Sequence, residues 1–98
     1  MRYLLLIIAS LVSSPALADP LMDEIKRSDD FAKYGKIQTE ALMRLIDNGT
    51  CKAEDIISVG AWYRSTSKKP APIFFTYCGG MTVKNRYYLD ARTGQVYQ

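Results

Sequence analysis

The apolar side chains along the first half of the chain recur with a helical period. Between Phe31 and Ile46 an apolar residue returns every three or four positions, which predicts an amphipathic helix over this segment. The stripe consists of Phe31, Tyr34, Ile37, Ala41, Leu42, Leu45 and Ile46. Asn48 and Gly49 follow it and are typical of a helix C-terminus, so the helix is expected to end there.

A shorter helical stripe precedes this one. Asp19 and Pro20 suit the cap and the first turn of a helix, and apolar residues follow between Leu21 and Ile25. The polar segment 26–30 interrupts the pattern, so we expect the helix to loosen or break there. Gly35, inside the longer stripe, costs up to about 1 kcal/mol relative to alanine and would let another backbone approach closely.

After Cys51 the pattern becomes alternating. A short helical turn is expected at residues 52–56, and Gly79-Gly80 is expected to be a tight hairpin turn. Strands are expected at residues 58–65, 72–78, 81–89 and 95–98. Short connections between successive strands predict an α+β fold, in which the N-terminal helix packs on a three- to four-stranded antiparallel meander.

Residues 1–18 carry the parts of a cleavable secretory signal peptide. Arg2 precedes an apolar run that begins at Tyr3, Pro15 breaks it, and an A-x-A site ends at Ala18. We therefore expect cleavage between Ala18 and Asp19, which leaves residues 19–98 as one small domain. The apolar run is shorter than the roughly 20 residues that span a bilayer, so no membrane anchor is expected after cleavage. The predicted location is the periplasm or the extracellular space.

The two cysteines, Cys51 and Cys78, both lie in the predicted mature chain. Because an oxidising compartment favours pairing of an even cysteine count, we expect a disulfide between them. Strict alternation places Cys78 on the Phe74 side of its strand, whereas Cys51, leaving the helix, should lie nearer the Ile73 side. Either the strand bulges before Gly79, or Cys51 wraps around a sheet edge.

Charge is distributed unevenly along the mature chain. Residues 19–55 carry six basic and nine acidic residues, and residues 56–98 carry six basic residues and one acidic residue. Attraction between the two halves explains this distribution, and so does a basic surface that meets an anionic partner. Another protein or an anionic envelope component is the expected partner, and nucleic acid is not, because the excess is modest and the chain is exported.

Catalytic chemistry has little support in the composition. The chain contains no histidine, the commonest general base and metal ligand. Two distant cysteines lack the paired spacing of a zinc site, and the adjacent acids at 29–30 and 54–55 are expected to diverge. We therefore expect neither an enzyme nor a bound metal or cofactor.

A candidate binding surface follows from the strand alternation. Aromatic and basic residues are expected to share the sheet face opposite the helix, where they would resemble an interaction hot spot. Its candidate members are Trp62, Arg64, Phe74, Lys84, Arg86 and Tyr88. The competing interpretation is that cross-strand aromatic pairs only stabilise the sheet.

The last fifteen residues, with the D-x-x-T-G-x-V pattern at Asp90–Val96, resemble the strand-turn-strand endings of PepSY-type periplasmic domains. The resemblance covers only this hairpin, and nothing about function is carried over from it. The sequence thus predicts a non-enzymatic binding or inhibitor-type module that acts through the aromatic-basic face. The alternative is an envelope structural or stress accessory protein with no discrete ligand site.

Overall fold

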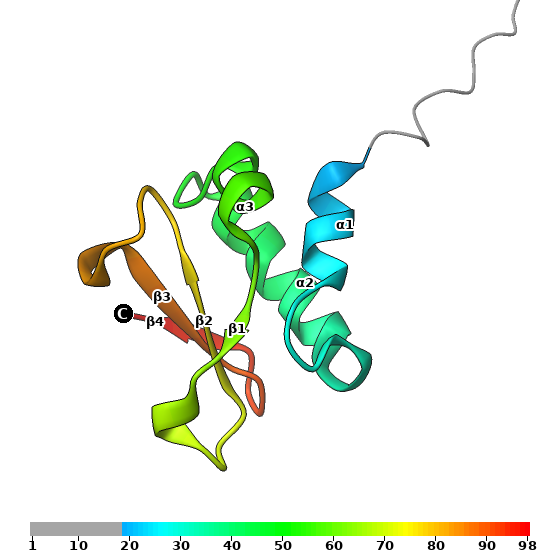
Figure 1. Ribbon diagram of the computed structural model, residues 1–98, viewed down its shortest axis with the longest axis vertical. Coiled ribbons are helices and arrows are strands. Elements are labelled where there is room, and N and C mark those ends of the chain that lie inside the picture. The colour runs from blue at the N-terminus through cyan, green and yellow to red at the C-terminus, as the bar shows by residue number, and fades with distance from the viewer. Residues whose placement is uncertain (1–18) are drawn as a thin grey trace, which may run out of the picture.

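The computed structural model describes residues 19–98, in which three helices pack on a four-stranded antiparallel sheet (Figure 1). The helices are α1 (Pro20–Lys26), α2 (Phe31–Asp47) and α3 (Ala53–Val59). The strands are β1 (Tyr63–Arg64), β2 (Ile73–Tyr77), β3 (Arg86–Asp90) and β4 (Gln95–Tyr97), and they lie in the sheet in chain order. The predicted α+β meander is confirmed. The predicted signal peptide and the Ala18 side of its cleavage site lie outside the described residues.

The helix boundaries follow the capping signals. The Asp19 carboxylate accepts a hydrogen bond from the Met22 N–H at 2.9 Å and starts α1. Residues 27–30 separate α1 from α2, so the predicted break within the polar segment 26–30 is confirmed. Asn48 caps α2, and Gly49 follows with a φ of 85°, which favours glycine.

Gly35 has a different role from the predicted one. The side chain that lies against it is the ring of Phe31, one turn earlier in the same helix. A Cβ at Gly35 would lie 2.8 Å from this ring, so the glycine makes room for an aromatic side chain rather than for another backbone.

Two predicted strands are shorter than expected. Helix α3 continues to Val59 and ends at Gly60, whose φ is 114°, so β1 contains only Tyr63–Arg64 of the predicted segment 58–65. Segment 81–85 is a turn that contains the 3-10 helix η4 (Val83–Asn85) rather than the start of β3. The tight Gly79-Gly80 turn is therefore part of a longer loop, which the Cys78 N–H closes by donating to the Asn85 carbonyl at 3.0 Å.

The strand register determines which side chains face the helices. Phe74 of β2 pairs with Leu89 of β3, and both are fully buried. Trp62, just before β1, is 1% exposed, and its indole nitrogen donates to the Gln38 carbonyl in α2 at 2.9 Å. The core is therefore built between the helices and the Phe74 side of the sheet, together with Ile25, Ala41, Leu42, Leu45 and Ile56.

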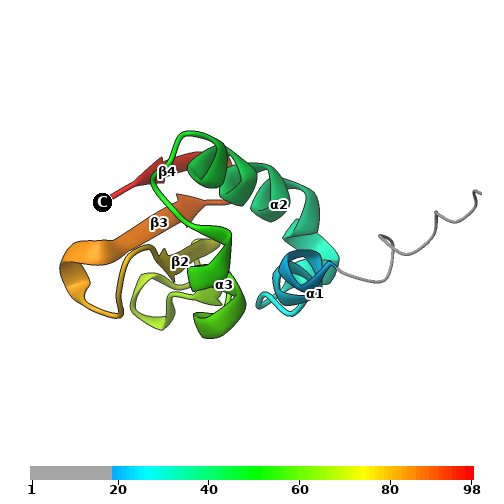
Figure 2. The ribbon, with the colours of Figure 1, turned by 90° about the horizontal axis from the view of Figure 1, so that it is seen from above.

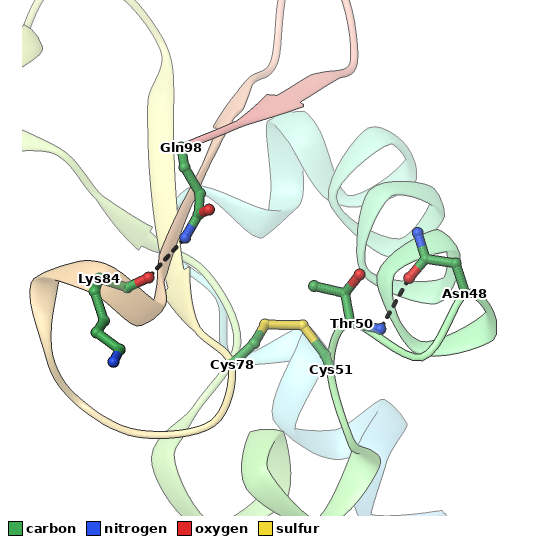
Figure 3. Close-up of a disulfide and its surroundings, with 6 residues drawn as sticks. All are labelled: Asn48, Thr50, Cys51, Cys78, Lys84 and Gln98. Carbon is green, nitrogen blue, oxygen red and sulfur yellow. Dashed lines mark hydrogen bonds between the residues drawn. A yellow bond between two sulfur atoms is a disulfide. The ribbon is translucent and has the colours of Figure 1, made fainter.

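The predicted disulfide between Cys51 and Cys78 is confirmed (Figure 3). Their Cα atoms lie 4.8 Å apart, and both residues are buried at the edge of the core. Because Phe74 faces the helices, strict alternation brings Cys78 to the helix side as well, where Cys51 follows α2. Neither a bulge nor a chain wrapped around the sheet edge is needed.

Candidate interaction surface

The sheet face turned away from the helices carries most of the tyrosines of the β half. The register aligns Tyr63, Phe75, Tyr88 and Tyr97 in one row across all four strands. Tyr77 and Arg86 form a neighbouring pair on the same face. We call this surface the aromatic face; it consists of Tyr63, Phe75, Tyr77, Arg86, Tyr88 and Tyr97.

The rings of this face contact one another in sequence. Phe75 lies at the centre, with ring centroids 5.7 Å from Tyr63, 5.7 Å from Tyr77 and 6.4 Å from Tyr88. The rings of Tyr88 and Tyr97 are stacked at 5.5 Å. Aromatic ring pairs at these separations, across strands and along β2, are attractive, so they hold the side chains in fixed orientations. The face is thus a continuous aromatic layer.

Tyr63 marks the β1 edge of this layer. It is 36% exposed, and its hydroxyl donates to the Val59 carbonyl at the end of α3. Burial of the phenol, followed by the nearby charges of Glu24 and Asp29, raises the pKa of Tyr63. The phenol therefore stays neutral and keeps its role as a hydrogen-bond donor.

Arg86 is held within the aromatic layer by three neighbouring rings. Its guanidinium donates to the Tyr77 hydroxyl at 2.8 Å and to the Tyr88 hydroxyl at 3.2 Å. The same group lies 5.1 Å from the centroid of Phe75 and 5.3 Å from that of Tyr77, within the range of cation–π attraction. The hydrogen bond to Tyr88, then that to Tyr77, raises the pKa of Arg86, which stays charged.

The charge of Arg86 is not neutralised locally. No carboxylate among residues 19–98 lies within ion-pair distance of it, and its buried Nε has no hydrogen-bond partner there. Lys68, in the 3-10 helix η3 (Thr66–Lys68), brings a second cation to within 5.2 Å of the Tyr88 ring centroid. Asp90, at the other end of β3, pairs with Arg92. The aromatic face is therefore positively charged.

The structure contradicts the predicted membership of this face. Trp62 and Phe74 are buried in the core. The register pairs Phe74 with Leu89 of β3, so Phe74 lies on the opposite side of the sheet from Tyr88. Arg64 lies on the Phe74 side, with its guanidinium 5.5 Å from that ring and paired with Asp30. Its Nη2 also faces the Pro70 and Ala71 carbonyls.

The remaining three candidates are all accessible to some degree. Arg86 and Tyr88 lie on the aromatic face, and Lys84 is exposed in η4, in the loop beyond it. Sequence reasoning did not group Tyr63, Phe75 and Tyr77 with them. The alternation within each strand was predicted correctly, and it would have identified these residues if the register between strands had been known.

Other sites are not evident in the part of the chain that the structure describes. No group of three metal-ligating side chains was found among residues 19–98. None of the described helices is long and apolar enough to cross a membrane. No protein-family model, curated protein or solved structure gives a significant match to the chain.

Proposed function

We propose that the chain is an exported, non-enzymatic binding module that holds the acidic surface of another protein against its aromatic face. The observation that carries the proposal is the unpaired charge of Arg86, set among aromatic rings on a face that the helices leave uncovered. Tyrosine and arginine are enriched among the residues that dominate binding energy at protein interfaces.

Preorganisation supports this proposal. Hydrogen bonds to Tyr77 and Tyr88 fix the guanidinium of Arg86 before any partner arrives. Binding therefore costs less side-chain entropy than it would for a freely rotating arginine. A partner carboxylate could accept from the N–H groups that the tyrosines leave free, and the tyrosine rings would supply flat contact area around that ion pair.

Export to an oxidising compartment would explain the presence of the disulfide. A disulfide persists in oxidising compartments, and the buried Cys51–Cys78 bond fits a chain that works in the periplasm or outside the cell. The signal-peptide pattern of residues 1–18 points to the same location.

Partner capture with matched charge variants tests the proposed function. Purified exported protein is immobilised and incubated with envelope extract from the producing cell, and bound proteins are identified by mass spectrometry. Arg86→Gln removes the unpaired cation of the aromatic face. Lys36→Gln removes one positive charge from an exposed position of α2 and leaves the face intact. Thermal unfolding of both variants verifies that each is folded.

We expect one acidic partner to bind the wild type and Lys36→Gln equally and to bind Arg86→Gln at least about tenfold more weakly. Raising the salt concentration should release it, because the contact depends on charge. Equal capture by the two variants, or no captured partner, contradicts the proposal. The rings of the face would then only stabilise the sheet, as expected of an envelope accessory protein with no discrete site.

A further inference from the structure

The two edge strands of the sheet, β1 and β4, differ in whether their outward main-chain groups have hydrogen-bond partners. At the β1 edge, the Asp29 N–H donates to the Trp62 carbonyl at 3.0 Å, and the Asp29 carboxylate accepts from the Arg64 N–H at 2.7 Å. Asp29 thus satisfies the outward main-chain groups of this edge as a neighbouring strand would. Covering an edge in this way prevents it from pairing with another chain.

The β4 edge has no such cover within residues 19–98. The hydrogen bonds from Cys78 to Asn85 and from Ala91 to Pro72 show that the odd-numbered residues of β3 direct their main chain toward β2. Even-numbered residues of β3 therefore face β4, and they pair with Gln95 and Tyr97. It follows that the N–H and C=O groups of Val96, between these two, point away from the sheet.

A groove runs along this open edge. It lies between β4 and α2, which is beside β4 in Figure 2, and it has a volume of about 360 Å³. Ala41 and Leu45 of α2 and Val96 of β4 give it an apolar lining. Arg44 is the charged residue among those lining it, and its Nη2 donates to the Gly94 carbonyl at 2.7 Å, just before β4.

We propose that this groove binds an extended acidic peptide segment, which adds to β4 as an antiparallel fifth strand. Main-chain hydrogen bonds to Val96 would supply the pairing, as in other cases of strand addition to an open edge. A peptide residue opposite Val96 would share its side of the sheet and reach the apolar lining, since paired residues lie on one face. An acidic residue two positions away would lie on the same side and reach Arg44.

The positive charge of Arg44 favours an acidic peptide over a second copy of the chain as the ligand of this groove. Pairing of two β4 edges would place the Arg44 side chains of both copies along one shared groove, where like charges repel. An acidic segment compensates the same charge. The groove shares Tyr97 with the aromatic face, but its apolar lining and Arg44 belong to the helix side of the sheet. The proposal therefore stands whether or not the aromatic face binds a protein.

The test uses a synthetic peptide, acetyl-Thr-Glu-Thr-Val-Thr-Glu-Thr-amide, and 15N-labelled protein purified after export. The central valine suits the apolar lining, and a glutamate two positions to either side lies on the valine's side of the strand, so that one of them reaches Arg44. Two control peptides carry an N-methyl group on the valine or lysine in place of both glutamates. Arg44→Gln and Lys36→Gln form the matched pair of protein variants.

We expect the peptide to shift the amide signals of Val96 and Gln98 in NMR spectra in a saturable way. N-methylation removes a donor to the Val96 carbonyl and should weaken binding at least about tenfold. The lysine peptide and the Arg44→Gln protein should each weaken it several-fold, while Lys36→Gln binds as the wild type does. Absent or displaced shifts, or equal binding of the N-methylated peptide, overturn the proposal. So do shifts of the β4 signals that grow with protein concentration when no peptide is present, because they indicate self-pairing.

Discussion

The indole nitrogen of Trp62 donates a hydrogen bond to the main-chain carbonyl of Gln38, 2.9 Å away in the middle of α2. The Trp62 main-chain N–H also donates to the Ser28 hydroxyl between α1 and α2, at 3.2 Å. Both Trp62 and Gln38 are buried. Trp62 therefore connects the start of β1 to α2 and to the loop between α1 and α2, and its role is structural.

Substitutions at Trp62 should lower stability according to what each removes. Trp62→Phe keeps an aromatic ring but leaves the Gln38 carbonyl without this donor, and we expect a loss of about 1–2 kcal/mol in the free energy of unfolding. Trp62→Ala also creates a cavity and should cost about 3–5 kcal/mol. Urea denaturation measures both. A stability equal to that of the wild type in Trp62→Ala contradicts the core assignment.

The disulfide should contribute strongly to stability. Cys51 and Cys78 are separated by 27 positions, and the chain-entropy relation for a loop of this size gives about 3.5 kcal/mol. The Cys51→Ala/Cys78→Ala double variant should therefore unfold at a much lower urea concentration. A midpoint within error of the oxidised wild type would show that the bond does not constrain the unfolded chain.

The edge contact at Asp29 predicts a contrast between two substitutions. Asp29→Ala removes the acceptor of the Arg64 N–H and should cost about 1 kcal/mol. Asp29→Asn keeps an oxygen in the same place and should cost less. Hydrogen exchange of the Arg64 amide should be faster in the alanine variant than in the asparagine variant. Equal exchange rates and equal stabilities would mean that Asp29 does not pair with this edge.

The β3–β4 turn should make stability depend on pH in acid. Hydrogen bonds from the Arg92 side chain and main chain hold the pKa of Asp90 below its ordinary value. The Asp90 carboxylate therefore stabilises the fold above its ordinary pKa of about 3.9, and this contribution is lost as the pH falls through the lower folded-state value. Asp90→Asn lacks this contribution. Its unfolding free energy should fall less steeply than that of the wild type below about pH 4, and parallel profiles contradict this assignment.

Local signals in the sequence were sufficient for the first two helices, α1 and α2. Asp19, the polar break after Lys26 and the Asn48-Gly49 pair mark the helix ends where the structure has them. Caps and breaks of this kind act through neighbouring residues, so they can be read without the rest of the fold. Residues 58–59 were misassigned because their alternating pattern is also compatible with the last turn of α3.

The candidate surface depended on information that is not local. Alternation within β2 correctly predicted that Phe74 and Phe75 point to opposite sides of the sheet. It does not show which of these two side chains points toward the helices. The register with β3 places Phe74 on the same side as the buried Leu89 and Phe75 on the same side as Tyr88, and this register depends on the length of the loop through η4. A one-residue difference in register inverts the face of every side chain. For this reason the prediction grouped Trp62 and Phe74 with Tyr88, and the structure separates them.

Protection of tyrosines in the captured complex tests most directly which side of the sheet binds a partner. Free protein and complex are nitrated with tetranitromethane, and modified tyrosines are quantified by mass spectrometry. Binding on the aromatic face predicts that Tyr88 and Tyr97 are modified less in the complex, while Tyr34, on the helix side, is modified equally in both. Protection of Tyr34, with Tyr88 and Tyr97 modified as in the free protein, would contradict the account.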